Sequence, residues 1–205
     1  MILIVDCGFG NLGSIRNMLK QVSSTQSIIS SSPKDIHRAQ KIILPGVGTF
    51  DRAMRSLQEK GLLSVLQYSV VVEKKMYLGI CLGMQILFEK SEEGEVPGLG
   101  WIEGEVVRFN FREEHPNLKI PHMGWDQVHQ VKKSGILSQM YSEGRFYFAH
   151  SYHAICARKE DILLTTEYGY EFVSGVQKGN IYGMQFHPEK SHKYGKKIFE
   201  NFCDL

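Results

Sequence analysis

The sequence predicts an α/β fold in one domain spanning residues 1–205, with a largely parallel central sheet to which antiparallel strands are added. Strand-like and helix-like apolar patterns alternate through residue 90, which is typical of parallel strands joined by helices. Beyond residue 101 most apolar runs look like short strands, and Gly179-Asn180 is a hairpin signal. No linker separates the two halves, so the added strands extend the same sheet.

The composition is that of a globular protein without features that indicate nucleic-acid or membrane binding. Hydrophobic residues at 42% and charged residues at 22% are ordinary globular values, and a net charge of +2 gives no case for nucleic acid or a membrane surface. No apolar run is long enough to span a membrane, and the chain opens on a strand-like run instead of a signal peptide. Its four cysteines form no C-x-x-C motif, so neither zinc nor a disulfide framework is indicated. We expect a cytoplasmic protein.

The first half contains four apolar runs of strand length: Ile2–Val5, Ser27–Ile29, Lys41–Leu44 and Met76–Ile80. Apolar residues at helical spacing follow each of them. The helices expected from this spacing lie within Leu12–Val22, after Ser32-Pro33, from Phe50 through Leu57, within Leu62–Val72, and from Leu82 to about Glu89.

Cys81 lies between the last strand of this series and the next helix, with Gly79 and Gly83 two residues to either side. This is the Gly-x-nucleophile-x-Gly layout of a strand-to-helix elbow, in which glycine permits a tight turn. The N-terminus of the helix would favour the thiolate, and the backbone N–H of Leu82 would face an oxyanion. The alternative is a buried structural cysteine in an ordinary strand–helix unit.

Two glycine-rich turns follow other strands. Asp6–Asn11 lacks the third glycine of a dinucleotide fingerprint, so that interpretation is weak. Pro45–Gly48 follows the third strand, and its exposed amides could line a site above Cys81, because ligands in such sheets gather at the carboxyl ends of strands.

In the second half, strands are expected at Ile102–Phe109, Asp126–Val131, Arg145–Ser151, Phe172–Gln177 and Ile181–Phe186, before a final helix from about Lys193. Glu92–Glu95 reads as an acidic surface loop. The apolar loop Pro121–Trp125 reads as a core plug or a partner-binding patch, and the residues alone favour the plug.

A general base for Cys81 is available at the end of the last strand. His187 directly follows the apolar run, Pro188 fixes the turn, and Glu189 can curl back to hydrogen-bond the imidazole. A histidine and a carboxylate at this spacing, in a chain that also has a cysteine elbow, indicate nucleophilic catalysis.

The segments Gly79–Gln85 (GICLGMQ) and Phe186–Ser191 (FHPEKS) resemble those of the class I (triad) glutamine amidotransferases, whose fold is flavodoxin-like. Pro45–Gly48 (PGVG) and Pro121–Trp125 (PHMGW) narrow the resemblance to the glutaminase subunits of imidazole glycerol phosphate synthase, from histidine biosynthesis. The match covers the whole chain in order.

The resemblance implies that L-glutamine is hydrolysed to glutamate and ammonia through a glutamyl thioester, without a cofactor or a metal. It assigns Cys81 as the nucleophile, His187 as the acid/base and Glu189 as the residue that orients His187. The remaining site residues that it implies are the oxyanion hole of Val47, Gly48 and Leu82, and the glutamine contacts of Gln85, Glu93, Ser151 and Tyr152.

The resemblance also implies a heterodimer with a separate (β/α)8-barrel cyclase subunit, which uses the ammonia to make imidazole glycerol phosphate and AICAR. Ammonia needs a dry passage between the two sites, because water would protonate or dilute it. The residues expected to face the partner are Asn11, Pro121, Met123, Trp125 and Lys190.

Two residues depart from the pattern of this family. Cys7 stands where tyrosine is common and Asp126 where asparagine is common, and both are expected near the partner interface. The alternative function is therefore a paralogous glutaminase that supplies ammonia to an enzyme that aminates or amidinates a bacterial surface sugar. A different cysteine hydrolase is disfavoured by Gln85 and Glu93, and a non-catalytic subunit is disfavoured because the cysteine, histidine and glutamate are all present.

Overall fold

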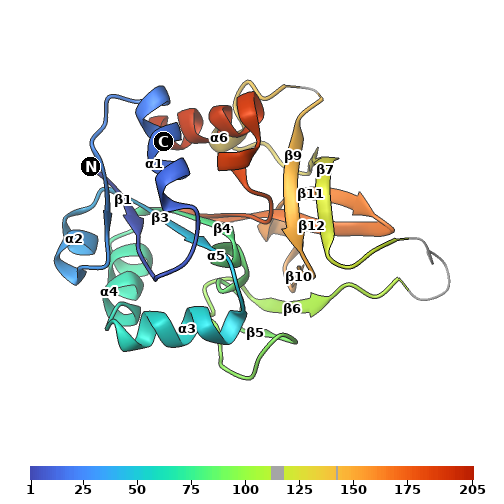
Figure 1. Ribbon diagram of the computed structural model, residues 1–205, viewed down its shortest axis with the longest axis horizontal. Helices are drawn as coiled ribbons and strands as arrows, with labels where there is room; N and C mark the ends of the chain where they lie inside the picture. Colours follow the sequence, from blue (N-terminus) through green and yellow to red (C-terminus); the bar gives the residue numbers. More distant parts are fainter. Residues whose placement is uncertain (112–117, 142) are drawn as a thin grey trace.

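The computed structural model describes residues 1–111, 118–141 and 143–205, which form a central sheet with helices on both faces (Figure 1). The order of strands in this sheet is β2-β1-β3-β4-β13-β12-β10-β6-β5, with β11 and β8 joined along β12. The sheet is mixed and mostly parallel in its first half, so the predicted fold class is confirmed.

The parallel part of the sheet contains five strands: β1 (Ile2–Val5), β2 (Ser27–Ser30), β3 (Lys41–Gly46), β4 (Met76–Cys81) and β13 (Ile181–Met184). Their side chains are buried on both faces. Leu3 and Val5 pack into the core on one side of the sheet, while Ile2 and Ile4 pack into the core on the other. This two-sided burial explains why these strands are continuous apolar runs in the sequence.

The second half adds the remaining strands of the sheet: β5 (Lys90–Ser91), β6 (Gly104–Arg108), β8 (His129–Gln130), β10 (Tyr152–Cys156), β11 (Ile162–Tyr168) and β12 (Tyr170–Lys178). β12 pairs antiparallel with β13 across the predicted Gly179-Asn180 hairpin, where Gly179 has φ +57°. The sequence analysis did not predict β5, β10 or β11, although the β-branched and aromatic run of β11 is a strand signal.

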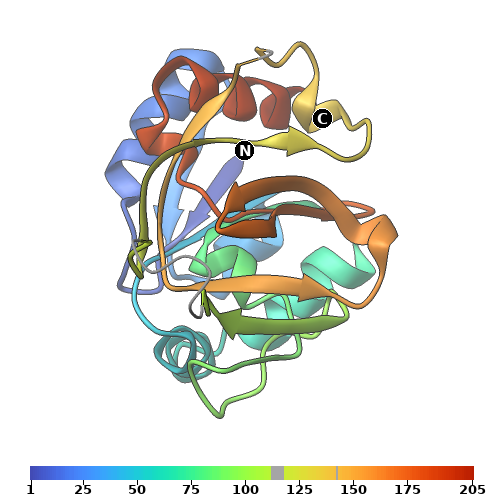
Figure 2. The same cartoon turned by 90° about the vertical axis from the view of Figure 1, so that its right-hand side faces the viewer.

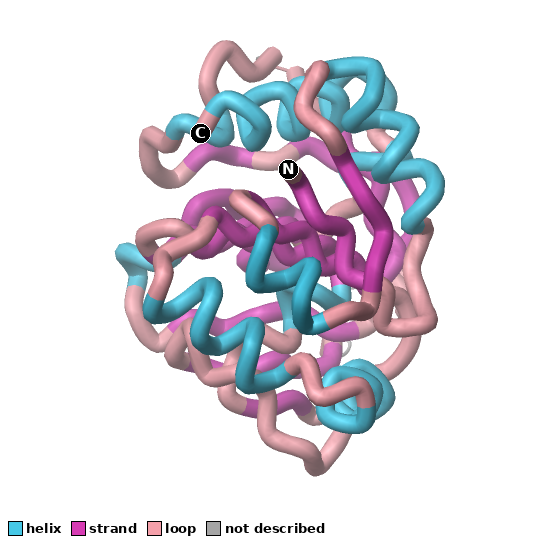
Figure 3. The backbone as a smooth tube through the Cα atoms, turned by 90° about the vertical axis from the view of Figure 1, so that its left-hand side faces the viewer, coloured by secondary structure: helices cyan, strands magenta, loops and turns pink. Residues whose placement is uncertain are grey.

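The helices form two layers. α1 (Leu12–Val22) and α6 (His192–Asp204) cover one face of the sheet, as Figure 3 shows from the side of the N-terminal strands. The other face is covered by α2 (Pro33–Arg38), α3 (Phe50–Glu59), α4 (Leu63–Gln67) and the π-helical turn η1 (Tyr68–Val72). α1, α3 and α6 bury the apolar residues that their sequence spacing predicted.

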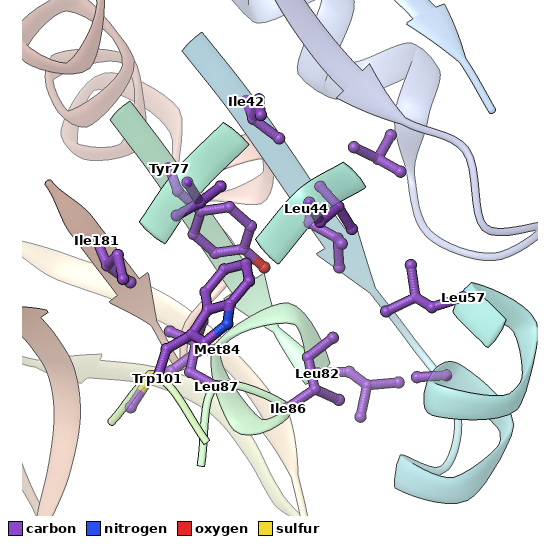
Figure 4. Packing of buried hydrophobic residues seen from close by; sticks show 14 of the residues in the cluster. Ile42, Leu44, Leu57, Tyr77, Leu82, Met84, Ile86, Leu87, Trp101 and Ile181 are labelled. Atoms are coloured by element: carbon purple, nitrogen blue, oxygen red, sulfur yellow. The ribbon is translucent and has the colours of Figure 1, made fainter. Parts of the chain in front are cut away.

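The helix expected from Leu82 to about Glu89 is wrong in length. α5 is a single turn, Leu82–Gln85, and every side chain from 82 to 88 is buried (Figure 4). The carbonyl groups of Ile86 and Leu87 accept hydrogen bonds from Leu99 N (2.8 Å) and Trp101 N (2.9 Å) instead of continuing the helix. The chain turns into the core here, so the apolar spacing that indicated an amphipathic helix reflects burial on all sides.

The interpretation of Pro121–Trp125 as a loop is also wrong. Residues 122–127 form β7 (His122–Gln127), which pairs antiparallel with β9 (Arg145–His150) in a separate two-stranded ribbon. Figures 1 and 2 show this ribbon at one end of the molecule, beside β10, β11 and β12. Met123 and Trp125 point outward and are 64% and 41% exposed, so the segment is an exposed patch and not a core plug.

The close approach of α5 to the sheet can be tested by a substitution at Gly83. A Cβ at this position would lie 1.9 Å from the carbonyl oxygen of Leu44 in β3, so the backbone would have to move. Gly83→Ala should lower the free energy of unfolding by about 3 kcal/mol in urea denaturation, as overpacking that displaces backbone does. Gly13→Ala in α1, where a Cβ meets nothing within 4 Å, should instead raise it by up to about 1 kcal/mol. Equal effects of the two substitutions would contradict this account.

Candidate active site

The candidate site is assembled by the parallel pairing of three strands. β4 lies between β3 and β13, with Gly46 opposite Cys81 and Met184 opposite Ile80. The segments that follow these strands therefore emerge side by side at the carboxyl edge of the sheet. This register brings Val47–Gly48, Cys81–Leu82 and Gln185–His187 to one place.

Cys81 has the backbone of a strained elbow, with φ +54° and ψ −109° at the junction of β4 and α5. A Cβ at Gly79 would lie 2.2 Å from the carbonyl oxygen of Gly83, and one at Gly46 would lie 2.7 Å from the Cβ of Leu82. The glycines are required by this crowding. Because α5 is only one turn long, the contribution of a helix dipole to the thiolate is smaller than the sequence analysis expected.

His187 and Glu189 form a buried pair next to Cys81. His187 Nδ1 and Glu189 Oε1 are 2.9 Å apart, and their side chains are 4% and 2% exposed. The backbone of His187 is fixed from two sides, since its N–H donates to Tyr147 O (2.8 Å) and its C=O accepts from Ser191 Oγ (2.6 Å). With Nδ1 engaged by Glu189, the other ring nitrogen is left for Cys81.

The electrostatics of the pair favour a charged imidazole. Burial acts to lower the pKa of His187, but the charge of Cys81, a hydrogen bond to Cys81 and the bond to Glu189 outweigh it, and the net pKa is raised. Glu189 Oε2 is buried without a hydrogen-bond partner among the described residues, so its charge is balanced chiefly by His187. The arrangement suits a thiolate–imidazolium pair.

A cavity of about 270 Å³ opens above Cys81. It contains every residue that the sequence analysis placed in the oxyanion hole or around glutamine. The lining residues are Val47, Gly48, Cys81, Leu82, Gln85, Glu93, Pro121, Met123, Ala149, His150, Ser151 and Tyr152. Residues from four distant stretches of the chain therefore converge on one pocket.

The potential oxyanion donors come from two segments of the chain next to Cys81. Leu82 begins α5 directly after Cys81, and Val47–Gly48 follow β3 on the neighbouring strand. Gly48 has φ +113°, a conformation that favours glycine, and Val47 is 44% exposed. Both residues of this turn line the cavity.

Gln85 is held by both hydrogens of its amide nitrogen. Gln85 Nε2 donates to Tyr152 O (2.9 Å) and to Gln185 Oε1 (3.1 Å). No hydrogen bond to the Oε1 atom of Gln85 is found within the described ranges, so this acceptor is available to a ligand in the cavity.

Gln185 is a site residue that the sequence analysis missed. It is fully buried, and its Nε2 donates to Cys81 Sγ over 3.7 Å. The signal was present, because an amide in the middle of the apolar run Ile181–Phe186 needs a partner when the strand is buried.

Glu93 is a half-buried carboxylate on the wall of the cavity. Its Oε2 accepts from the backbone N–H of Phe50 (2.8 Å) at the start of α3. Burial raises the pKa of Glu93, which the Phe50 hydrogen bond partly opposes. The carboxylate is thus fixed at one oxygen, and the interpretation of the acidic segment as a plain surface loop does not hold for this residue.

The residues expected to face a partner fall in two groups. Pro121 and Met123 line the mouth of the cavity. The other three lie outside the cavity. Trp125 stacks on His192 with ring centroids 5.2 Å apart, and Lys190 Nζ lies 5.3 Å from the Tyr147 ring centroid. Asn11 precedes α1.

Neither of the two residues that depart from the family pattern has its side chain on the exposed face of Met123 and Trp125. Cys7 is 3% exposed and belongs to the core between the sheet and α3, so its side chain is not on a partner surface. Asp126 lies on the opposite face of β7 from Met123 and Trp125, because strand side chains alternate, and it binds His122.

Neither a metal site nor a membrane span was found in the ranges that the structure describes. No three histidine, cysteine, aspartate or glutamate side chains in those ranges are grouped to hold a metal ion. No helix there is long and apolar enough to cross a membrane.

The chain matches the glutamine amidotransferase class-I family over residues 3–205. It is 50% identical over 202 residues to imidazole glycerol phosphate synthase subunit HisH 2 of Methanococcus maripaludis, covering 98% of each chain. It is 47% identical to subunit HisH 2 of Pseudomonas aeruginosa and 44% identical to subunit HisH 1 of Campylobacter jejuni, covering 100% of each chain in both cases.

Solved structures support the fold at lower identity. PurLQS from Thermotoga maritima aligns with a TM-score of 0.71 at 18% identity, covering 99% of this chain and 97% of that one. The glutaminase domain of CTPS from Trypanosoma brucei aligns with a TM-score of 0.68 at 19% identity, covering 98% of this chain and 91% of that one.

The contact between Gln185 and Cys81 can be tested without any substrate. Gln185→Leu removes the donor to the sulfur, so Cys81 loses a hydrogen bond at its reacting atom. The rate at which iodoacetamide alkylates Cys81 at pH 7 should fall by about tenfold, which corresponds to the loss of one hydrogen bond. Gln177→Leu is the matched control, since that amide bonds to Gly179 and Tyr182. An unchanged alkylation rate in Gln185→Leu would remove Gln185 from the site.

Proposed function

The chain belongs to the glutamine amidotransferase class-I family and, within it, with the HisH subunits of imidazole glycerol phosphate synthase, and from this membership we propose that it hydrolyses L-glutamine through a Cys81–His187–Glu189 triad. The observation that carries the proposal is the single cavity that holds Cys81 together with Gln85 and Glu93. A nucleophile paired with a buried histidine can open an amide, and the polar groups opposite it suit a small amino acid.

The first step forms a thioester and releases ammonia. The Cys81 thiolate attacks the side-chain carbonyl carbon of glutamine, and the negative charge moves to the carbonyl oxygen. The amides of Leu82 and the Val47–Gly48 turn are the available donors for this oxyanion. His187, held in its charged form beside Cys81, gives its proton to the amide nitrogen, so that ammonia leaves as the C–N bond breaks.

The second step returns the enzyme to its starting state. Neutral His187 takes a proton from a water molecule that attacks the glutamyl thioester, and glutamate leaves as the C–S bond breaks. Glu189 keeps the ring in one orientation and stabilises its positive charge in each cycle, because it is bound to Nδ1 at 2.9 Å.

The α-amino-acid end of glutamine is recognised by groups on the far wall of the cavity. Glu93 presents a carboxylate to the α-ammonium group, and the backbone at Ser151 and Tyr152, which line the same cavity, forms the other clamp. Tyr152 O is itself held by Gln85 Nε2 (2.9 Å), which couples the clamp to the elbow.

The proposed partner is a separate (β/α)8-barrel cyclase subunit that takes up the ammonia. The exposed side chains of Val47, Met123 and Trp125 lie around or beside the mouth of the cavity, where a dry contact would keep ammonia from water. Asn11, Pro121 and Lys190 complete the surface proposed for this contact.

A second acceptor for the ammonia is favoured by the names of the relatives. Three of them carry a copy number, HisH 2 or HisH 1, so those organisms contain more than one such subunit. One copy could serve histidine biosynthesis and another could supply an enzyme that aminates or amidinates a surface sugar. The chemistry at Cys81 is the same in both cases.

Glutamate release from glutamine, measured with and without the histidine-pathway cyclase and its nucleotide ligand, separates these functions. We expect release that disappears in Cys81→Ala, and a rate that rises at least about tenfold with the liganded cyclase, because closing the partner onto the cavity excludes water and orders the oxyanion donors. Turnover that depends on Cys81 but ignores the cyclase would identify the surface-sugar branch. Equal turnover in Cys81→Ala would overturn the proposed mechanism.

Glu93→Gln tests the proposed contact with the α-ammonium group. The KM for glutamine should rise by about tenfold to a hundredfold with little change in kcat, since a charged hydrogen bond contributes about 1.5 to 3 kcal/mol. Because the pKa of Glu93 is raised, acidification should protonate it sooner than an ordinary glutamate and raise KM in the unsubstituted enzyme only. Glu92→Gln, whose carboxylate bonds to Arg108 N instead (2.7 Å), is the control. A larger loss in kcat than in KM would place Glu93 in the chemical step instead.

A further inference from the structure

A continuous line of hydrogen bonds crosses from β7 to the wall of the Cys81 cavity. Asp126 Oδ2 lies 2.7 Å from His122 Nε2, and His122 Nδ1 lies 3.2 Å from His150 Nε2. His150 Nδ1 then lies 2.8 Å from the carbonyl oxygen of Tyr152. The line begins on the inner face of β7 and ends at a backbone group that lines the cavity.

The side chains of this line are fixed by strand geometry and packing. His122 and His150 are cross-strand partners in the β7–β9 ribbon, and Asp126 lies four residues after His122 on the same face. Both rings are buried, at 1% and 5% exposure. His122 is stacked between Tyr168 and Phe148, with ring centroids 3.9 Å and 4.7 Å away, so its ring cannot turn to another partner.

The three contacts of this line require three hydrogens in total. The Tyr152 carbonyl and an ionised Asp126 are both acceptors, so all three hydrogens must come from the four ring nitrogens of His122 and His150. Two neutral imidazoles carry only two N–H groups. The complete line therefore contains one extra proton, and one of the two rings is an imidazolium.

The surroundings place this proton on His122. Burial lowers the pKa of His122, and the hydrogen bond and charge of Asp126 oppose that effect. His150 has no carboxylate beside it: burial and the charges of neighbouring histidines lower its pKa to about 3, against the opposing effect of the Tyr152 carbonyl. Of the two rings, only His122 therefore has a carboxylate that stabilises its charge.

The other titratable groups near the line do not supply the missing hydrogen. Tyr168 OH donates to Lys119 O (2.8 Å), and His153 Nε2 is paired with Tyr170 OH (2.9 Å). Among the described residues, the ion pairs of Asp126 are with His122 alone. The titratable groups around the two rings and Asp126 are His153 of β10, Tyr168 of β11, Tyr170 of β12, His187 after β13, and His129, Arg145 and Glu167 in the cavity at Asp126.

We propose that Asp126, His122 and His150 are positioning residues for glutamine, and that a proton on His122 completes the line that holds the Tyr152 carbonyl. The inference rests on the proposed function, because the Ser151–Tyr152 backbone is the proposed clamp. When the proton leaves, Asp126 retains the one N–H of His122, so either the contact between the rings or the contact with Tyr152 brings two lone pairs together. In the second case Gln85 holds the carbonyl alone.

Asp126 is the residue that makes this line depend on pH. An asparagine could turn its NH2 group toward a neutral His122, and this donor plus two ring N–H groups would supply three hydrogens without a charge. In this chain an aspartate stands where asparagine is common in the family that the sequence resembles. While it is ionised, the aspartate can supply no hydrogen to the line.

The test compares Asp126→Asn with the unsubstituted chain, using 15N spectra of the histidine rings from pH 8 down to the lowest pH at which both proteins stay folded, because the pKa of His122 is lowered. In the unsubstituted chain, His122 should pass from imidazolium to neutral shifts with one midpoint, and in Asp126→Asn it should remain neutral throughout. His122→Gln assigns the signals. Asp35→Asn is the matched control, since Asp35 accepts from Ser30 at the other end of the sheet.

Glutamine binding supplies the functional readout. In a Cys81→Ala background, calorimetry should show the Kd for glutamine rising by about fivefold across the His122 midpoint, as the loss of one neutral hydrogen bond would cause, and this rise should be absent from Asp126→Asn. A His122 signal without a midpoint, or identical Kd profiles in the two proteins, would overturn the inference. A His122 midpoint with no glutamine binding at any pH would overturn the proposed function instead.

Discussion

The parallel pairing of β4 with β3 on one side and β13 on the other is the constraint on which the site depends. It places the ends of three strands from distant parts of the chain at one edge of the sheet, with Gly46 opposite Cys81. The close approach of α5 requires glycine at three crossing points, where a Cβ would meet other atoms within 2.7 Å. A shift of one residue in this register would move Cys81 away from His187, so fold stability and the site share the same contacts.

Burial acts on the ionisable groups of the site in different ways, according to their partners. His187 keeps a raised pKa because Cys81 and Glu189 lie beside it, whereas His150, equally buried but without a carboxylate, has its pKa lowered to about 3. Desolvation penalises every charge, and only a specific partner reverses that penalty. The difference between these two histidines separates a residue poised for proton transfer from one that donates a hydrogen bond as a neutral ring.

The β7–β9 ribbon links the exposed patch to the cavity. Met123 and Trp125 lie on its outer face, while His122 and Asp126 lie on its inner face and reach the Tyr152 carbonyl through His150. Alternation along one strand therefore gives the ribbon an exposed face, where a partner is proposed to bind, and a polar line toward the proposed glutamine clamp. The resemblance had implied the first role, whereas the polar line was not evident from the sequence, because the segment was interpreted as a loop and the pairing of His122 with His150 spans 28 residues.

The sequence by itself determined the parallel core and the cysteine elbow, because glycine spacing and apolar runs are local consequences of a tight turn and a two-sided sheet. The residues expected around Cys81 came mostly from the resemblance to the class I glutamine amidotransferases. The sequence also indicated His187 with Glu189, since their two-residue spacing is local. Only the tertiary structure decided the length of α5, the strand at 122–127, the burial of Cys7 and the contacts of Gln185 and Asp126. Each of these depends on which distant segment covers a given backbone or side chain, and local spacing holds no record of that.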